Sequence, residues 1–155
     1  MKTMKNTSKK VLLLLALVAT SLTFAQLKPM DGSKMAMSKY SFSETVNMVK
    51  SAIENQNLMV IKEIDGQKMM RMAGKQTKGM QQIFFMHPKY MRKVIEANKM
   101  AGIQIPLKLI VMENEKGVMI RYFMPSTILK QYKGTEAVTG ELDGLVSNII
   151  AEVKK

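Results

Sequence analysis

The chain contains no cysteine and no tryptophan, and it has a single histidine. The lack of cysteine excludes disulfides, thiolate nucleophiles and the acylated cysteine that anchors a lipoprotein. Zinc sites need three or four nitrogen, thiolate or carboxylate ligands, so one imidazole without thiolates argues against zinc. The 5 Phe and 4 Tyr residues are too few for the stacking platform of single-stranded nucleic-acid binders. We therefore expect no nucleic-acid partner.

Long hydrophobic runs are also missing. The longest, residues 11–22, spans about 12 residues, whereas a transmembrane helix needs about 18 or more. Four lysines precede this run within the first ten residues, and Thr23-Phe24-Ala25 follows it. This layout is typical of a secretory signal peptide over residues 1–25, cleaved before Gln26. We expect a periplasmic or secreted protein that keeps no integral membrane span after cleavage and is not a lipoprotein.

Acidic residues are half as numerous as basic ones. The chain has 24 Lys and Arg against 12 Asp and Glu, and removal of the four signal-peptide lysines leaves 20 against 12, a net charge of +8. A basic protein can meet phosphate, nucleic acid or anionic lipid. The lysines are scattered rather than clustered, so we interpret the charge mainly as a solvated surface.

The first half of the expected mature chain predicts a flexible segment, a helix and a strand. Residues 26–38 contain Pro, Gly and Ser without an apolar period, which predicts a flexible lead-in before a single domain at residues 39–155. Ser41 and Glu44 form a capping-box pattern ahead of a helix that fades near residue 55. Residues 58–64 predict a strand closed by Asp65-Gly66. The spacing of apolar residues in 67–80 fits either a helix or a strand.

The second half predicts three strands and three helical segments. Residues 81–87 read as a strand, and Pro88 suits the first position of a following helix. Residues 105–114 and 117–124 predict a hairpin, and residues 125–132 a short helix. Leu142 to Val153 form an amphipathic C-terminal helix. The expected fold is a single α+β domain with helices packed on one face of a mostly antiparallel sheet.

The stretch FMHPKYMRKVIEANKMAGIQIPLKLIVMENEKGVMIRYFMP, residues 85–125, resembles the DUF302 family of small bacterial domains of unknown function. The matching positions are Phe85, Pro88, Pro106, Gly117, Tyr122 and Pro125. The resemblance implies a curved antiparallel sheet backed by helices, like that of the TATA-binding protein. It also allows a homodimer.

Two positions depart from the family pattern. Members often carry an Asp-His pair, but here Asp65 is followed by Gly66. The Gly-Asn that precedes the family's proline is Met86-His87 in this chain. No role of the Asp-His pair carries over, and the resemblance implies a fold without implying a reaction.

The sequence contains no recognisable catalytic constellation. A nucleophile needs an adjacent base that a third group orients, and neither Gly-x-Ser-x-Gly nor Ser-x-x-Lys is present. Paired carboxylates remain an alternative because Glu63, Asp65, Glu113 and Glu115 fall near strand ends, where acids usually form turns. We therefore predict a non-catalytic protein.

Methionine is abundant. Fifteen of the 17 methionines lie beyond residue 25, against seven leucines. Thioethers bind Cu(I), and an imidazole can complete the ligand set. The candidate soft-metal ligands are Met86, His87 and Met91, joined by Met69, Met70 or Met72, with Met30, Met35 and Met37 in the lead-in. Two alternatives stay open: methionine fills the core in place of leucine, or it absorbs oxidants reversibly.

These observations predict an exported, non-catalytic module that binds a small ligand or a protein partner. The alternative is a periplasmic Cu(I) or Ag(I) binder that uses methionines and His87. We expect His87 chiefly to mark the turn from strand to helix.

Overall fold

The computed structural model describes residues 32–154. The predicted signal peptide, its cleavage site and Met30 lie outside the described residues. Within residues 32–154, no helix combines the length and apolar character needed to cross a bilayer.

Five strands form one antiparallel sheet, in the spatial order β1-β5-β4-β3-β2. The strands are β1 (Lys34–Ser38), β2 (Met59–Asp65), β3 (Met80–Met86), β4 (Leu107–Asn114) and β5 (Gly117–Tyr122). β1 and β2 are the edges of the sheet. A bulge at Ile61 interrupts the pairing of β2 with β3 between Val60 and Lys62.

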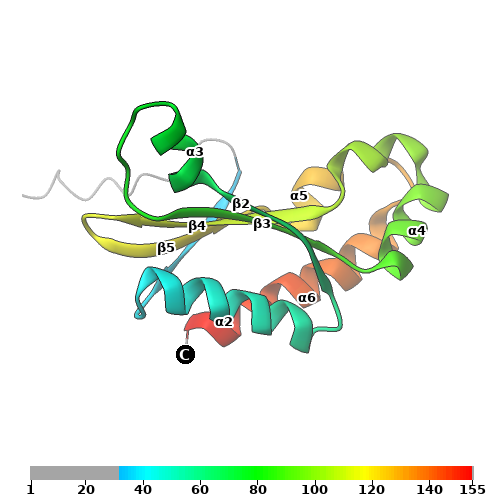
Figure 1. Cartoon of the computed structure of the whole chain (residues 1–155). Helices are drawn as coiled ribbons and strands as arrows, with labels where there is room; N and C mark the ends of the chain where they lie inside the picture. The colour runs from blue at the N-terminus through cyan, green and yellow to red at the C-terminus, as the bar shows by residue number, and fades with distance from the viewer. Residues whose placement is uncertain (1–31, 155) are drawn as a thin grey trace, which may run out of the picture. The chain divides into compact units, whose positions relative to one another are not determined.

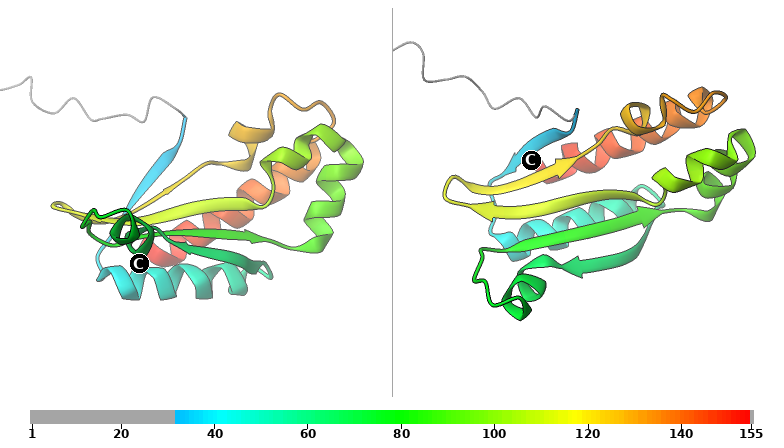
Figure 2. Two further views of the ribbon diagram at one scale, coloured as in Figure 1. Left: turned by 45° about the horizontal axis from the view of Figure 1, so that its top comes forward. Right: turned by 90° about the horizontal axis from the view of Figure 1, so that it is seen from above.

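Two long helices, α2 (Phe42–Asn55) and α6 (Glu136–Lys154), cover one face of the sheet (Figure 1). A shorter helix, α3 (Gly66–Met72), lies on the opposite side. The remaining helical segments are α4 (Pro88–Ala97), the 3₁₀ helix η1 (Lys99–Gln104) and α5 (Pro125–Leu129). Figure 2, in its right panel, looks onto the face opposite α2 and α6 and shows the strands lying in front of these helices.

The core lies between the sheet and the two long helices. Side chains alternate between the two faces of a strand, and the inward positions are buried, as at Ile83, Val111 and Ile120, each 0% exposed. The C-terminal helix contributes residues such as Leu142 and Ile149. The predicted α+β class, with helices on one face and an amphipathic C-terminal helix, is confirmed.

Helix α2 begins where the capping box predicts. The Glu44 amide donates to Ser41 Oγ, and Glu44 Oε2 accepts in return from the Ser41 amide at 3.0 Å. Both bonds satisfy amide groups that a helix N-terminus leaves without intrahelical partners.

Strand β1 corrects the predicted boundary of the domain. We expected residues 26–38 to be flexible, but residues 34–38 pair with β5, and Ala36 is 3% exposed beside Ile120. Met35, Ala36 and Met37 do alternate between exposed and buried positions. However, the buried residue is an alanine, whose small side chain gives little indication of a strand in the sequence. Pairing with a strand more than 80 residues away supplies the stability that the local sequence lacks.

The ambiguous stretch after β2 also takes a definite form. Residues 66–72 are helical, because Asp65 Oδ1 accepts from the Lys68 amide at 2.8 Å and caps the first turn. The predicted Asp65-Gly66 turn is thus the start of α3.

Candidate functional site

His87 occupies the N-cap of α4, immediately after β3. Its Nδ1 accepts from the Lys89 amide at 3.1 Å, and Pro88 takes the first helical position. The prediction that His87 marks the strand-to-helix turn is confirmed. This bond uses one of the two ring nitrogens and leaves Nε2 as the remaining ligand atom.

The methionines on either side of His87 lie in different environments. Met86 is 1% exposed and packs in the core, whereas Met91 on α4 is 38% exposed. A core thioether and a surface thioether therefore flank the imidazole.

The three methionines of α3 lie far from His87. Helix α3 contacts β3, and its first residue, Gly66, adjoins Met80 at the start of that strand. Met80 and Met86 are six residues apart along β3, which corresponds to about 20 Å. Met69, Met70 and Met72 thus gather at one end of β3, and Met86, His87 and Met91 at the other.

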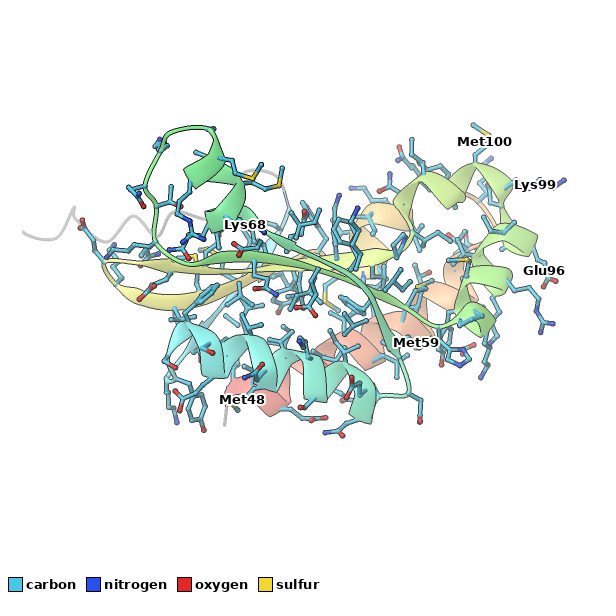
Figure 3. All side chains as sticks on the ribbon, viewed as in Figure 1. Met48, Met59, Lys68, Glu96, Lys99 and Met100 are labelled. Atoms are coloured by element: carbon cyan, nitrogen blue, oxygen red, sulfur yellow. The ribbon has the colours of Figure 1, made fainter. Side chains whose placement is uncertain are left out.

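On the sheet face opposite α2 and α6, α3 lies at one end, and η1 and α5 rise on the same side at the other end (Figures 1 and 3). In Figure 3, Lys68 stands on α3 on this side of the sheet, and Met48 on α2 on the other. We call this surface the open face. Residues that share a level across neighbouring strands have Cβ atoms about 4.5–5.5 Å apart, so the strand register defines which side chains meet there.

One level of the open face consists of methionines. Met37 pairs with Met119, Met119 with Met112, and Met112 with Met80. We call these four residues the methionine row. The sequence prediction missed it, because the row joins residues of four separate segments; the available signal was the alternation of Met112 and Met119 with buried neighbours.

A second level of the open face is cationic. Lys62 of β2 pairs with Phe84 of β3, and Phe84 pairs with Lys108 of β4. Arg121, one level nearer the methionine row, donates from Nε to Ser33 Oγ at 2.7 Å. Ser33 lies just before β1, at the end of that strand that is farther from Met37. The Arg121 guanidinium is therefore directed toward the level of Lys62 and Lys108. We call Lys62, Phe84, Lys108 and Arg121 the cationic end.

Three of the family-motif residues shape turns and helix starts. Pro88 and Pro125 each stand at the start of a helix, α4 and α5 respectively. Gly117 has φ +119° at the start of β5, a conformation that favours glycine. These positions are explained by backbone geometry.

The other three motif residues lie in strands or just before one. Phe85 is 2% exposed in the core, and Pro106 follows a cis peptide bond just before β4. Tyr122 pairs with Leu109, and partial burial raises the pKa of its hydroxyl. All six motif residues thus serve the fold.

Three of the four carboxylates considered for paired-carboxylate catalysis have structural partners. Glu63 forms an ion pair with Lys50 at 3.0 Å and accepts from Gln81. Asp65 caps α3, and Glu113 Oε2 accepts from an amide at 3.4 Å. Glu115 lies in the hairpin turn. Within residues 32–154, no three His, Asp or Glu side chains form a metal-binding group.

A cleft of about 230 Å³ lies between α4 and the start of α6. Lys93 and Glu141 line it and bond to each other at 2.5 Å. The bond from Lys93 holds the pKa of Glu141 below its usual value. The third charged lining residue, Glu96, forms an ion pair with Arg92, so each charged group that a ligand would use already has a partner.

Comparisons with known proteins agree with this architecture. The crystal structure of an uncharacterized conserved DUF302 protein from Bacillus stearothermophilus superposes with a TM-score of 0.73 at 12% identity, covering 79% of this chain and 98% of that one. At this identity the likeness concerns the fold. No curated protein matches the sequence. Residues 34–153 match the family described as "Domain of unknown function DUF302", and the chain therefore belongs to the DUF302 family.

Proposed function

We propose that this protein is a non-catalytic binding module whose open face holds a small anionic amphiphile, a molecule with an apolar body and a carboxylate, sulfate or phosphate head. One observation carries the proposal. The described strand residues that point to this face are apolar, neutral polar or cationic, and none of them is acidic.

The two ends of the face suit the two parts of such a ligand. Lys62 and Lys108 are exposed and flank Phe84, so a negatively charged head would meet two ammonium groups beside an aromatic ring. The apolar body would extend over Ile64 and Ile110, which share the next level with Gln82 and Arg121. From the lysine level to the methionine row is about 13 Å, because Lys108 and Met112 are four residues apart.

We also propose that the protein is exported and that it captures small molecules outside the cytoplasm. This part of the proposal rests on the signal-peptide pattern of residues 1–25. Intact mass of protein recovered from the expressing cells tests it, since a chain that begins at Gln26 supports export and one that retains residues 1–25 contradicts it.

The binding test uses two ligands with the same chain and opposite charge. Decanoate and decyltrimethylammonium are titrated into the protein, and affinity is measured by calorimetry. We expect decanoate to bind more tightly. The double variant Lys62→Gln, Lys108→Gln should weaken decanoate binding roughly tenfold, because each lost charge contact is worth up to about 1 kcal/mol near a surface.

A charge-matched control uses two lysines away from the open face. Lys99→Gln, Lys130→Gln removes the same net charge, and Figure 3 shows Lys99 on η1. Equal loss of affinity in both double variants would show that net charge alone drives binding. Equal affinity for the two ligands would contradict an anionic preference.

A further inference from the structure

Four neighbouring strands place a methionine at the same level of the open face, although they come from well-separated parts of the chain. We propose that the methionine row, Met37, Met119, Met112 and Met80, is a binding site for a soft monovalent cation, Cu(I) or Ag(I). The proposal does not depend on the binding of an anionic amphiphile.

Core packing does not explain the row. On the same strands, Ala36, Val111 and Ile120 supply the buried contacts. Met37 is 49% exposed, and the other three members of the row are partly exposed. Methionine replaces leucine in the core at Met86 and Met124, which are 1% and 9% exposed, whereas all four members of the row are at least partly exposed.

The spacing of the strands suits a thioether site. Neighbouring strands lie about 4.7–4.9 Å apart. Two sulfur atoms that bind one ion at about 2.3 Å each lie at most about 4.6 Å from each other. Methionine has three rotatable side-chain bonds, so paired residues such as Met112 and Met119 can bring their sulfur atoms to one ion. The strand backbone need not move.

Gly66 brings α3 against one end of the row. A Cβ atom at Gly66 would lie 2.5 Å from Met80 Cε, so glycine permits this close approach. Helix α3 carries Met69 and Met72, which are 60% and 80% exposed. These thioethers, predicted as partners of His87, thus lie near the row instead and can supply a further ligand.

The positive groups of the open-face strands leave room for a cation. Thioethers are neutral, so the bound ion keeps its charge. Arg121, one level from the row, is drawn toward Ser33 and away from the row. Lys62 and Lys108 lie two levels away, about 13 Å, which exceeds the screening length of about 8–10 Å at moderate salt.

The ligand chemistry also predicts a pH response. Thioethers have no proton to lose, so affinity should be equal at pH 7 and pH 5. An imidazole binds a metal ion only in its unprotonated form, so a site built on an imidazole would bind more weakly in acid.

The experiment titrates the full chain with silver nitrate in chloride-free buffer, and with Cu(I) against a competing chelator. The test variant is Met112→Leu, Met119→Leu, which removes two sulfur atoms with little change in volume. The control, Met48→Leu, Met100→Leu, removes two methionines from α2 and η1. His87→Ala tests the imidazole. We expect at least tenfold weaker binding in the test variant, and parent-like affinity in the other two.

Methyl NMR of the parent protein keeps the test decisive if the double variant fails to fold. Silver should shift the methyl resonances of Met112 and Met119 and leave that of Met48 unchanged. Parent-like binding by the test variant, loss of binding in His87→Ala, or equal loss in the control would each overturn the proposal. Decanoate binding by the test variant separates this result from failure of the proposed function, because that binding relies on the lysines.

Discussion

Gly79 is buried where the first turn of α2 meets the start of β3. A Cβ atom at this position would lie 2.6–2.7 Å from three ring atoms of Phe42, closer than real Cβ contacts. The Gly79 carbonyl accepts from the Glu113 amide at 2.8 Å, so the backbone here is also tied to β4. The absence of a side chain at Gly79 therefore allows α2 to approach the sheet.

We expect Gly79→Ala to lower the free energy of unfolding by about 1–3 kcal/mol, because the added methyl group overpacks the contact with Phe42. Chemical denaturation measures the change. The control is Gly140→Ala in α6, where a Cβ atom would meet nothing within 4 Å. There alanine should stabilise the helix by about 0.5–1 kcal/mol, and a loss of stability at both sites would contradict the packing argument.

At the level of the helix, the capping box of α2 links stability to pH. Hydrogen bonds from the Ser41 hydroxyl and then the Ser41 amide lower the pKa of Glu44 below its ordinary value of 4.5. A carboxylate whose pKa is lower in the folded state stabilises that state above its unfolded pKa. The contribution is lost as the pH falls through the folded pKa.

Glu44→Gln should therefore be less stable than the parent at neutral pH, and the difference should shrink as the pH falls below about 4.5. Thermal unfolding at several pH values between 3 and 7 measures it. The exposed Glu54 of the same helix is the control site: Glu54→Gln should track the parent. A difference for Glu44→Gln that is constant with pH would show that the charge of the carboxylate has no part in capping.

Helix α6 depends on its apolar stripe. Ile149 is 1% exposed, so Ile149→Asp places a carboxylate in the core without a partner. We expect a loss of roughly 3 kcal/mol or more, or an unfolded domain. The exposed neighbour gives the control, since Ser147→Asp should change stability by about 0.5 kcal/mol or less. Equal melting temperatures for the two variants would mean that α6 does not anchor the core.

For the molecule as a whole, the two faces of the sheet have different roles. Helices α2 and α6 contact each other and the sheet, so one core unites the most distant parts of the described chain. The open face carries the methionine row and the cationic end, and neither contributes to that core. Side chains on the open face can thus be changed for function at a small cost in stability.

This shared core predicts one cooperative unfolding transition. Helix content, followed by far-ultraviolet circular dichroism, and tyrosine packing, followed in the near ultraviolet, should give coincident denaturation curves. Separate midpoints would show that the helices and the sheet unfold as independent units.

Much of the fold follows from local sequence patterns. The capping box at Ser41, the strand before Pro88, the hairpin near Gly117 and the amphipathic helix up to Val153 were all predicted correctly. Each rests on interactions between residues close in the chain, or on a repeated apolar spacing. β1 was missed because its strand conformation depends on pairing with the distant β5.

The role of His87 at the turn could also be predicted from the local sequence, because an N-cap and the proline after it are neighbours in the chain. The grouping of the methionines could not be predicted in this way. Composition shows that methionine is abundant, but the partners of Met112 depend on the register of four strands. A shift of one residue in any strand would turn its methionine into the core. Register depends on the packing of both faces against the whole chain, and for that reason the methionine row and the cationic end exist only in the folded molecule.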